Sequence, residues 1–163
     1  MTTKTDFTPE EWLRLTVAPS LAASSVVMAS PSGPIGMFKE MEATAKQLQS
    51  AREQYASNEL VAAVLSEWEN MAKTREMPDL QTPKFASGEE AKAWWAEQMQ
   101  QLAALLAAKA TAEEAAGYKA FVYDAAVAAA EAGKDGGFLG IGGVRVTPEE
   151  QGALGALKAA LDL

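Results

Sequence analysis

A long uncharged stretch most constrains the fold of this chain. Residues 15–38 carry no charged side chain, although the whole chain has a net charge of −8. The stretch contains mainly small and apolar residues and is interrupted by Pro19, Pro31 and Pro34. Burying such a segment is favourable because it removes apolar surface from water without desolvating a charge. We therefore expect the segment to form the buried centre of a helical bundle.

The length and the missing residue types restrict the possible chemistry. The 163 residues fit a single domain over residues 1–163, long enough to bury roughly two-thirds of the surface of the unfolded chain. We expect residues 1–7 to be flexible and residues 77–87 to form an extended crossover. The chain has no cysteine and no histidine, which removes disulfides, thiolate chemistry and the commonest general base and metal ligand. We predict no cofactor and favour a non-enzymatic role.

The charge of the chain also limits its partners. Nucleic acids and anionic lipids are bound by lysine and arginine surfaces, whereas the basic residues of this acidic chain are scattered. Residues 15–38 are long enough to cross a bilayer, but their prolines and hydroxyl side chains disfavour a spanning helix. The N-terminus lacks the apolar region of a secretory signal. We expect a cytoplasmic protein that binds no nucleic acid and does not insert into a membrane.

Capping patterns divide the chain into helices. The tetrad Thr-Pro-Glu-Glu occurs at residues 8–11 and 147–150, and related patterns begin at Ser87 and Thr111. In such a pattern the hydroxyl accepts a hydrogen bond from the first helical turn, while the glutamate reaches back to the cap. Apolar residues then recur at steps of three and four. The sequence predicts an all-α bundle of five to six helices, beginning near residues 8, 34, 58, 88, 111 and 147, with a proline kink in the first.

The periodicity changes before the last helix, over about residues 138–146. Two short apolar runs flank a Gly-Gly pair there, which is typical of a small β-hairpin. Because two strands alone are marginally stable in water, the hairpin must dock on the bundle or on a partner. Phe138, Leu139, Ile141 and Arg145 are therefore our candidate interaction surface for a protein partner or a second copy of the chain. Simple docking onto the bundle is the alternative.

Two adjacent tryptophans, Trp94 and Trp95, form a second candidate site. Neighbouring residues on a helix point about 100° apart, so both cannot face one core unless the helix is nearly surrounded. One of them could therefore line an apolar ligand pocket or a subunit interface. A wide buried stripe on this helix is the alternative interpretation.

An acidic cluster near the glycine-rich segment forms a candidate metal site. Asp135, Glu149 and Glu150 could supply oxygen ligands, which suit calcium and magnesium. Their spacing does not match an EF-hand loop. Helix capping by Glu149 and Glu150 is the alternative, with weak divalent-metal binding left open.

Two resemblances follow from these motifs. Residues 30–36 and Lys39-Glu40, together with residues 137–150, resemble a set of small uncharacterised bacterial all-helical proteins, and this resemblance implies no activity. The tail over residues 125–161 also resembles TerB-like, tellurite-resistance-type domains. In these, an alanine-rich helix runs into an Asp-Gly turn and a Val-Ser/Thr-x-x-Glu helix start, matched here by Asp135-Gly136 and residues 146–150. This resemblance implies an acidic, metal-linked role in stress, and the glycine-rich insertion departs from its pattern.

The sequence as a whole favours a helical interaction or scaffold module that associates with itself or with a protein partner. The composition offers no recognisable catalytic arrangement. A carrier of an apolar ligand and a divalent-metal-binding, TerB-like stress protein are the alternatives.

Overall fold

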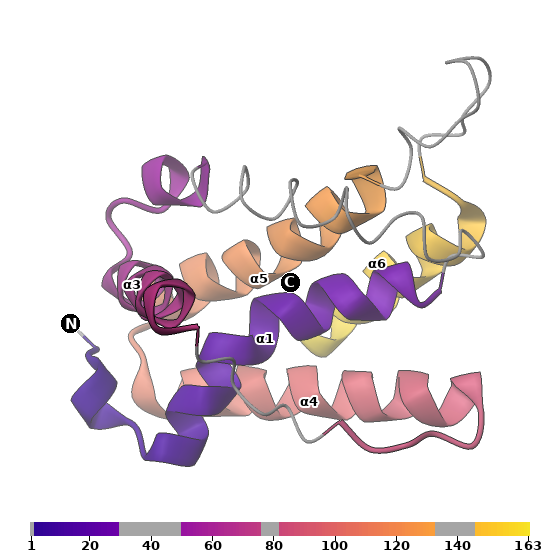
Figure 1. Ribbon diagram of the computed structural model, residues 1–163, viewed down its shortest axis with the longest axis horizontal. Helices are drawn as coiled ribbons and strands as arrows, with labels where there is room; N and C mark the ends of the chain where they lie inside the picture. The colour runs from indigo at the N-terminus through magenta and orange to yellow at the C-terminus, as the bar shows by residue number, and fades with distance from the viewer. Residues whose placement is uncertain (1, 30–49, 76–81, 133–145) are drawn as a thin grey trace.

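The fold is all-α in the part of the chain that the structure describes, and Figure 1 shows the arrangement of its helices. The structure is a computed structural model that describes residues 2–29, 50–75, 82–132 and 146–163. No strand occurs within these ranges. The elements are the 3-10 helix η1 (Lys4–Asp6) and the α-helices α1 (Pro9–Val27), α3 (Glu59–Thr74), α4 (Gly88–Lys109), α5 (Ala112–Ala132) and α6 (Pro148–Ala160).

The predicted capping patterns open the helices. At the start of α1, the Glu11 amide donates to Thr8 Oγ1 at 3.2 Å, and the Thr8 amide donates to the Glu11 carboxylate at 2.7 Å. The same reciprocal pair opens α5 and α6. At α4, the Glu90 amide donates to Ser87 Oγ, but the Glu90 carboxylate accepts from the Ala86 amide instead of the cap itself. These local bonds satisfy amides that a helix start leaves without partners.

Helix α1 lies at the centre of the bundle, as the uncharged stretch predicts. It packs against α3, α4 and α6 and most extensively against α5 (Figure 1). Its buried side chains include Leu15 and Val26, which are completely inaccessible to solvent. The prediction of a buried centre is therefore confirmed for the part of the stretch within α1, while residues 30–38 lie outside the described residues.

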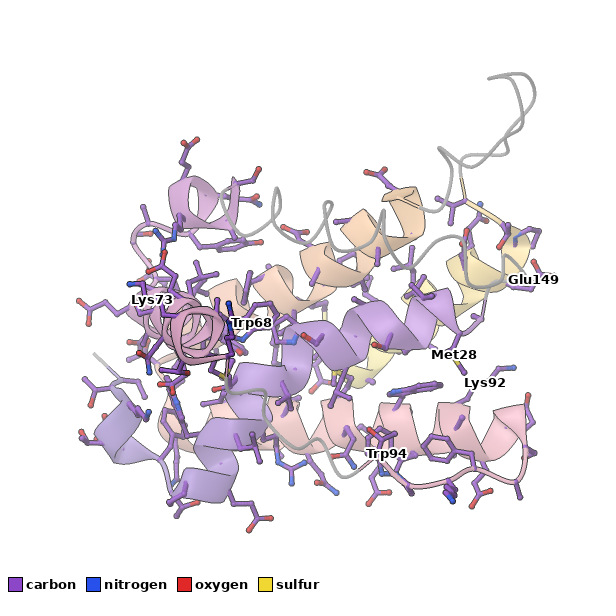
Figure 2. The ribbon with its side chains drawn as sticks, viewed as in Figure 1. Met28, Trp68, Lys73, Lys92, Trp94 and Glu149 are labelled. Atoms are coloured by element: carbon purple, nitrogen blue, oxygen red, sulfur yellow. The ribbon has the colours of Figure 1, made fainter. Side chains whose placement is uncertain are left out.

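Pro19 removes one backbone hydrogen bond from α1, and a side chain of α5 compensates for it. Proline has no amide hydrogen, so the carbonyl of Leu15, four residues earlier, loses its helical donor. That carbonyl accepts instead from the Tyr118 hydroxyl of α5 at 2.5 Å. The next carbonyl, of Thr16, accepts from the Trp68 indole nitrogen of α3 at 2.7 Å (Figure 2). Tyr118 is completely buried, which raises the pKa of its phenol, so the hydroxyl stays protonated and can donate.

Other predictions fall wholly or partly outside the described residues. The hairpin predicted over residues 138–146 lies outside them except for Val146, and so do residues 34–49 of the second predicted helix. Residues 50–54, at the end of that predicted helix, are helical. Residues 82–87 contain no helix and lead directly into α4.

Candidate functional site

A polar cleft opens between residues 54–59 and the start of α5. Its volume is about 510 Å³. The N-termini of α3 and α5 both reach it, and each carries an exposed glutamate in its first turn, Glu59 and Glu113. The cleft is lined by Gln54, Tyr55, Ser57, Asn58, Glu59, Thr111, Glu113, Glu114 and Gly117.

Asn58 joins the two walls of the cleft. Its side-chain oxygen accepts from the Val61 amide at 3.1 Å and so caps α3, while its side-chain nitrogen donates to the Glu114 carbonyl at 3.0 Å. A Cβ on Gly117 would stand only 2.4 Å from this nitrogen. A glycine at position 117 therefore allows α5 to approach the cap of α3 closely.

Glu114 is the most strongly hydrogen-bonded carboxylate described in the cleft. It accepts from the Thr2 amide and the Thr2 hydroxyl, both at 2.8 Å, and from the Thr111 amide and hydroxyl at 3.1 and 2.9 Å. These bonds favour the ionised form, and the bond from the Thr2 amide has the largest effect. They lower the pKa of Glu114 to about 2. Glu114 therefore acts as an ionised structural anchor over the whole physiological pH range.

Tyr55 and Asp124 form the shortest pair of titratable side chains beside the cleft. The Tyr55 hydroxyl donates to the Asp124 carboxylate at 2.6 Å, and the Gln54 side chain donates to the same carboxylate at 3.0 Å. Burial, followed by the hydrogen bond to Asp124, raises the pKa of Tyr55. A phenol whose pKa has moved further from neutrality is poorly suited to act as a base or nucleophile. This pair ties residues 50–57 to α5.

The candidate ligand site at Trp94 (labelled in Figure 2) and Trp95 forms an aromatic cluster with Phe85. All three side chains are partly exposed. The Phe85 ring centroid lies 5.5 Å from that of Trp94 and 5.8 Å from that of Trp95, and the two indoles are 6.4 Å apart. The Trp95 indole nitrogen is buried and has no hydrogen-bond partner within the described residues. The cluster thus carries one unpaired donor in an apolar setting.

The structure describes only part of the candidate metal site. Asp135 lies outside the described residues. Glu149 is exposed in the first turn of α6 (Figure 2), and Glu150 is buried with its carboxylate accepting from the Thr147 amide at 2.8 Å. Glu150 therefore takes part in helix capping. Across the ranges that the structure describes, no group of three or more acidic side chains is placed to hold a metal ion.

The candidate interaction residues Phe138, Leu139, Ile141 and Arg145 also lie outside the described residues. Among the described helices, none combines the length and the apolar character that crossing a membrane requires.

Sequence reasoning did not identify the polar cleft. The helix caps at Asn58 and Thr111 can be predicted from local sequence patterns. The contact between the two helix starts depends on how α3 and α5 pack. Gly117 in the middle of a helical pattern was the one available signal, because such a glycine often marks a close approach between elements. Comparisons with protein-family models, with curated proteins and with solved structures gave no match to this chain.

Proposed function

We propose that this protein is a non-enzymatic helical scaffold that associates with copies of itself through Phe138, Leu139 and Ile141. The observation that carries the proposal is the position of these three large apolar side chains among glycines in an acidic chain. The neighbouring glycines have no side chains that could cover these three apolar residues. Covering a side chain of this size on association is worth about 1.5–3 kcal/mol. A second copy of the same segment would supply such a cover, with Arg145 beside it.

Six titratable groups with shifted pKa values support a structural role. A catalytic acid or base works best when its pKa lies near the operating pH. Here hydrogen bonds lower the pKa of four carboxylates, and burial raises the pKa of two phenols, so all six move away from neutrality. These groups are Asp6, Glu11, Glu67, Glu114, Tyr55 and Tyr118. Each of them makes a contact that joins or caps helical segments.

Sedimentation velocity over a range of concentrations tests the proposal. We expect the wild-type chain to sediment as an oligomer and the triple variant F138S/L139S/I141S to sediment as a monomer of 17.2 kDa with unchanged helical circular dichroism. Met28→Ser is the matched control because Met28 is 70 % exposed at the end of α1 and should leave association intact. Association of the triple variant like that of the wild type would contradict the proposal. Loss of helical structure in that variant would also contradict it, because the segment would then belong to the core.

A second candidate function, binding of an apolar ligand that carries a carbonyl group, rests on the unpaired Trp95 indole nitrogen. A buried donor without an acceptor costs about 1–3 kcal/mol, and a ligand carbonyl would remove that cost. We expect quenching of tryptophan fluorescence by a long-chain methyl ester at concentrations about tenfold lower than by the matching alkane. Trp95→Phe keeps an aromatic ring and should abolish this preference. Absence of saturable quenching by either compound would exclude this function.

A further inference from the structure

The segment before α1, residues 2–7, crosses the end of the molecule where α4 passes into α5 (Figure 1). We call it the N-terminal strap. Its first residue, Thr2, is buried and donates to Glu114 of α5, and its last residue, Phe7, is 8 % exposed. Between them, η1 contributes no buried residue. Within the strap, Phe7 alone therefore belongs to the apolar core.

Two lysines fasten the strap to the helices. Lys109, in the last turn of α4, donates from Nζ to the Asp6 carbonyl at 3.1 Å and to the Glu11 carboxylate at 2.6 Å. The same ammonium lies 5.6 Å from the centroid of the Phe7 ring. Lys4, in the strap itself, donates to the Glu67 carboxylate of α3 at 2.6 Å. Ion pairs and hydrogen bonds of these lysines thus join the strap to the helices, beside the buried Phe7 ring and the Thr2–Glu114 hydrogen bonds.

The helices themselves are held together differently. Their contacts bury the large apolar cluster that includes Leu15, Leu60, Leu102 and Phe121. Apolar burial does not depend on a particular charge, whereas attraction between partly exposed charges is screened by salt. Local structure with few buried apolar contacts can also open separately from the rest of a domain. The strap and the helical body therefore differ in what stabilises them.

We propose that the N-terminal strap is a releasable element, fastened by Lys4 and Lys109, that opens when these charges are removed or screened while the helices remain folded. Opening uncovers the Trp12 ring, which is 6 % exposed, packs against Phe7 with ring centroids 6.0 Å apart and lies beneath the Lys4 ammonium. The strap thus controls access to the apolar face of Trp12 in α1. This device is independent of association through residues 138–141.

Backbone order parameters from nuclear magnetic resonance relaxation test this proposal. We expect S² of residues 4–7 to be about 0.85 in the wild-type chain and to fall below about 0.6 in the double variant K4Q/K109Q. The matched control K4R/K109R keeps both charges and should keep the strap ordered. A second control, Lys92→Gln, removes the exposed pair with Glu89 and should change nothing in the strap. In all these variants the amides of α1 and α3–α6 should retain their order.

Salt provides a second measurement on the unmodified chain. At about 1 M salt the screening length falls to about 3 Å, so the strap of the wild-type chain should lose order as it does in K4Q/K109Q. An ordered strap in K4Q/K109Q would overturn the proposal. So would a strap that is already disordered in the wild-type chain at low salt, or one that loses order only together with the helices.

Discussion

At the scale of single residues, Tyr118 has the clearest physical role in this protein. Its hydroxyl donates to the Leu15 carbonyl that Pro19 leaves without a helical donor. An unsatisfied carbonyl at this buried position would cost about 1–3 kcal/mol. The bond also orients α5 against α1, the two helices with the most extensive contact.

We predict that Tyr118→Phe lowers the free energy of unfolding by about 1–3 kcal/mol, because it removes the donor and leaves the Leu15 carbonyl unpaired. In a Pro19→Ala background the alanine amide can donate to the same carbonyl, so the cost of Tyr118→Phe should be smaller there. Urea denaturation of the two single variants and the double variant measures this coupling. If the two substitutions change the free energy of unfolding additively, the Tyr118 hydroxyl does not compensate for the donor that Pro19 removes.

At the scale of secondary-structure elements, the start of α5 is the most connected position described. Glu114 completes the capping box with Thr111, holds Thr2 of the strap and supplies the carbonyl that binds Asn58. One residue in the first turn thus links α5 to the strap and to the start of α3. The position of Glu114 also suits the helix dipole, which favours negative charge at an N-terminus.

This arrangement predicts acid sensitivity with a defined sign. The pKa of Glu114 is lowered from 4.5 to about 2, so its ionised form is favoured by folding. Its contribution is fully present above pH 4.5 and is lost as the pH falls through about 2. We expect the stability of Glu114→Gln to decline less than that of the wild type between these pH values, as measured by urea denaturation. Parallel pH profiles for the two chains would contradict this role of Glu114.

Local features of the fold could be predicted from the sequence because their signals lie within a few residues. The Thr-Pro-Glu-Glu tetrad placed the start of α1 at Thr8 and that of α6 at Thr147. The uncharged stretch likewise identified the centre of the bundle. Contacts between elements could not be predicted in this way, because the Tyr118–Leu15 bond joins residues 103 positions apart. No local pattern encodes such a pairing.

In the candidate sites, too, local features could be predicted from the sequence and contacts between distant residues could not. The tryptophan pair could be recognised as unusual, but its contact with Phe85 and its unpaired indole nitrogen required the packing of α4 against residues 82–87. We expected residues 1–7 to be flexible. The contacts of Thr2 with Glu114 and of Lys109 with the Asp6 carbonyl come from distant helices.

At the scale of the whole molecule, the helical body is supported by its own contacts. The Tyr118 hydroxyl of α5 binds the carbonyl that Pro19 leaves without a helical donor, and caps satisfy the helix starts. We propose that the segment between α5 and α6 associates with a second copy while this helical body keeps its own core. This separation of a helical framework from an associating segment is the central claim of the proposed function.

Native mass spectrometry of the wild-type chain, purified gently from its own host, tests this claim most directly, because it weighs the assembly and anything bound to it. Self-association predicts a whole-number multiple, greater than one, of the 17.2 kDa chain. A bare monomer at every concentration would contradict it. A monomer carrying additional mass would also contradict it and would favour the apolar-ligand function at Trp95.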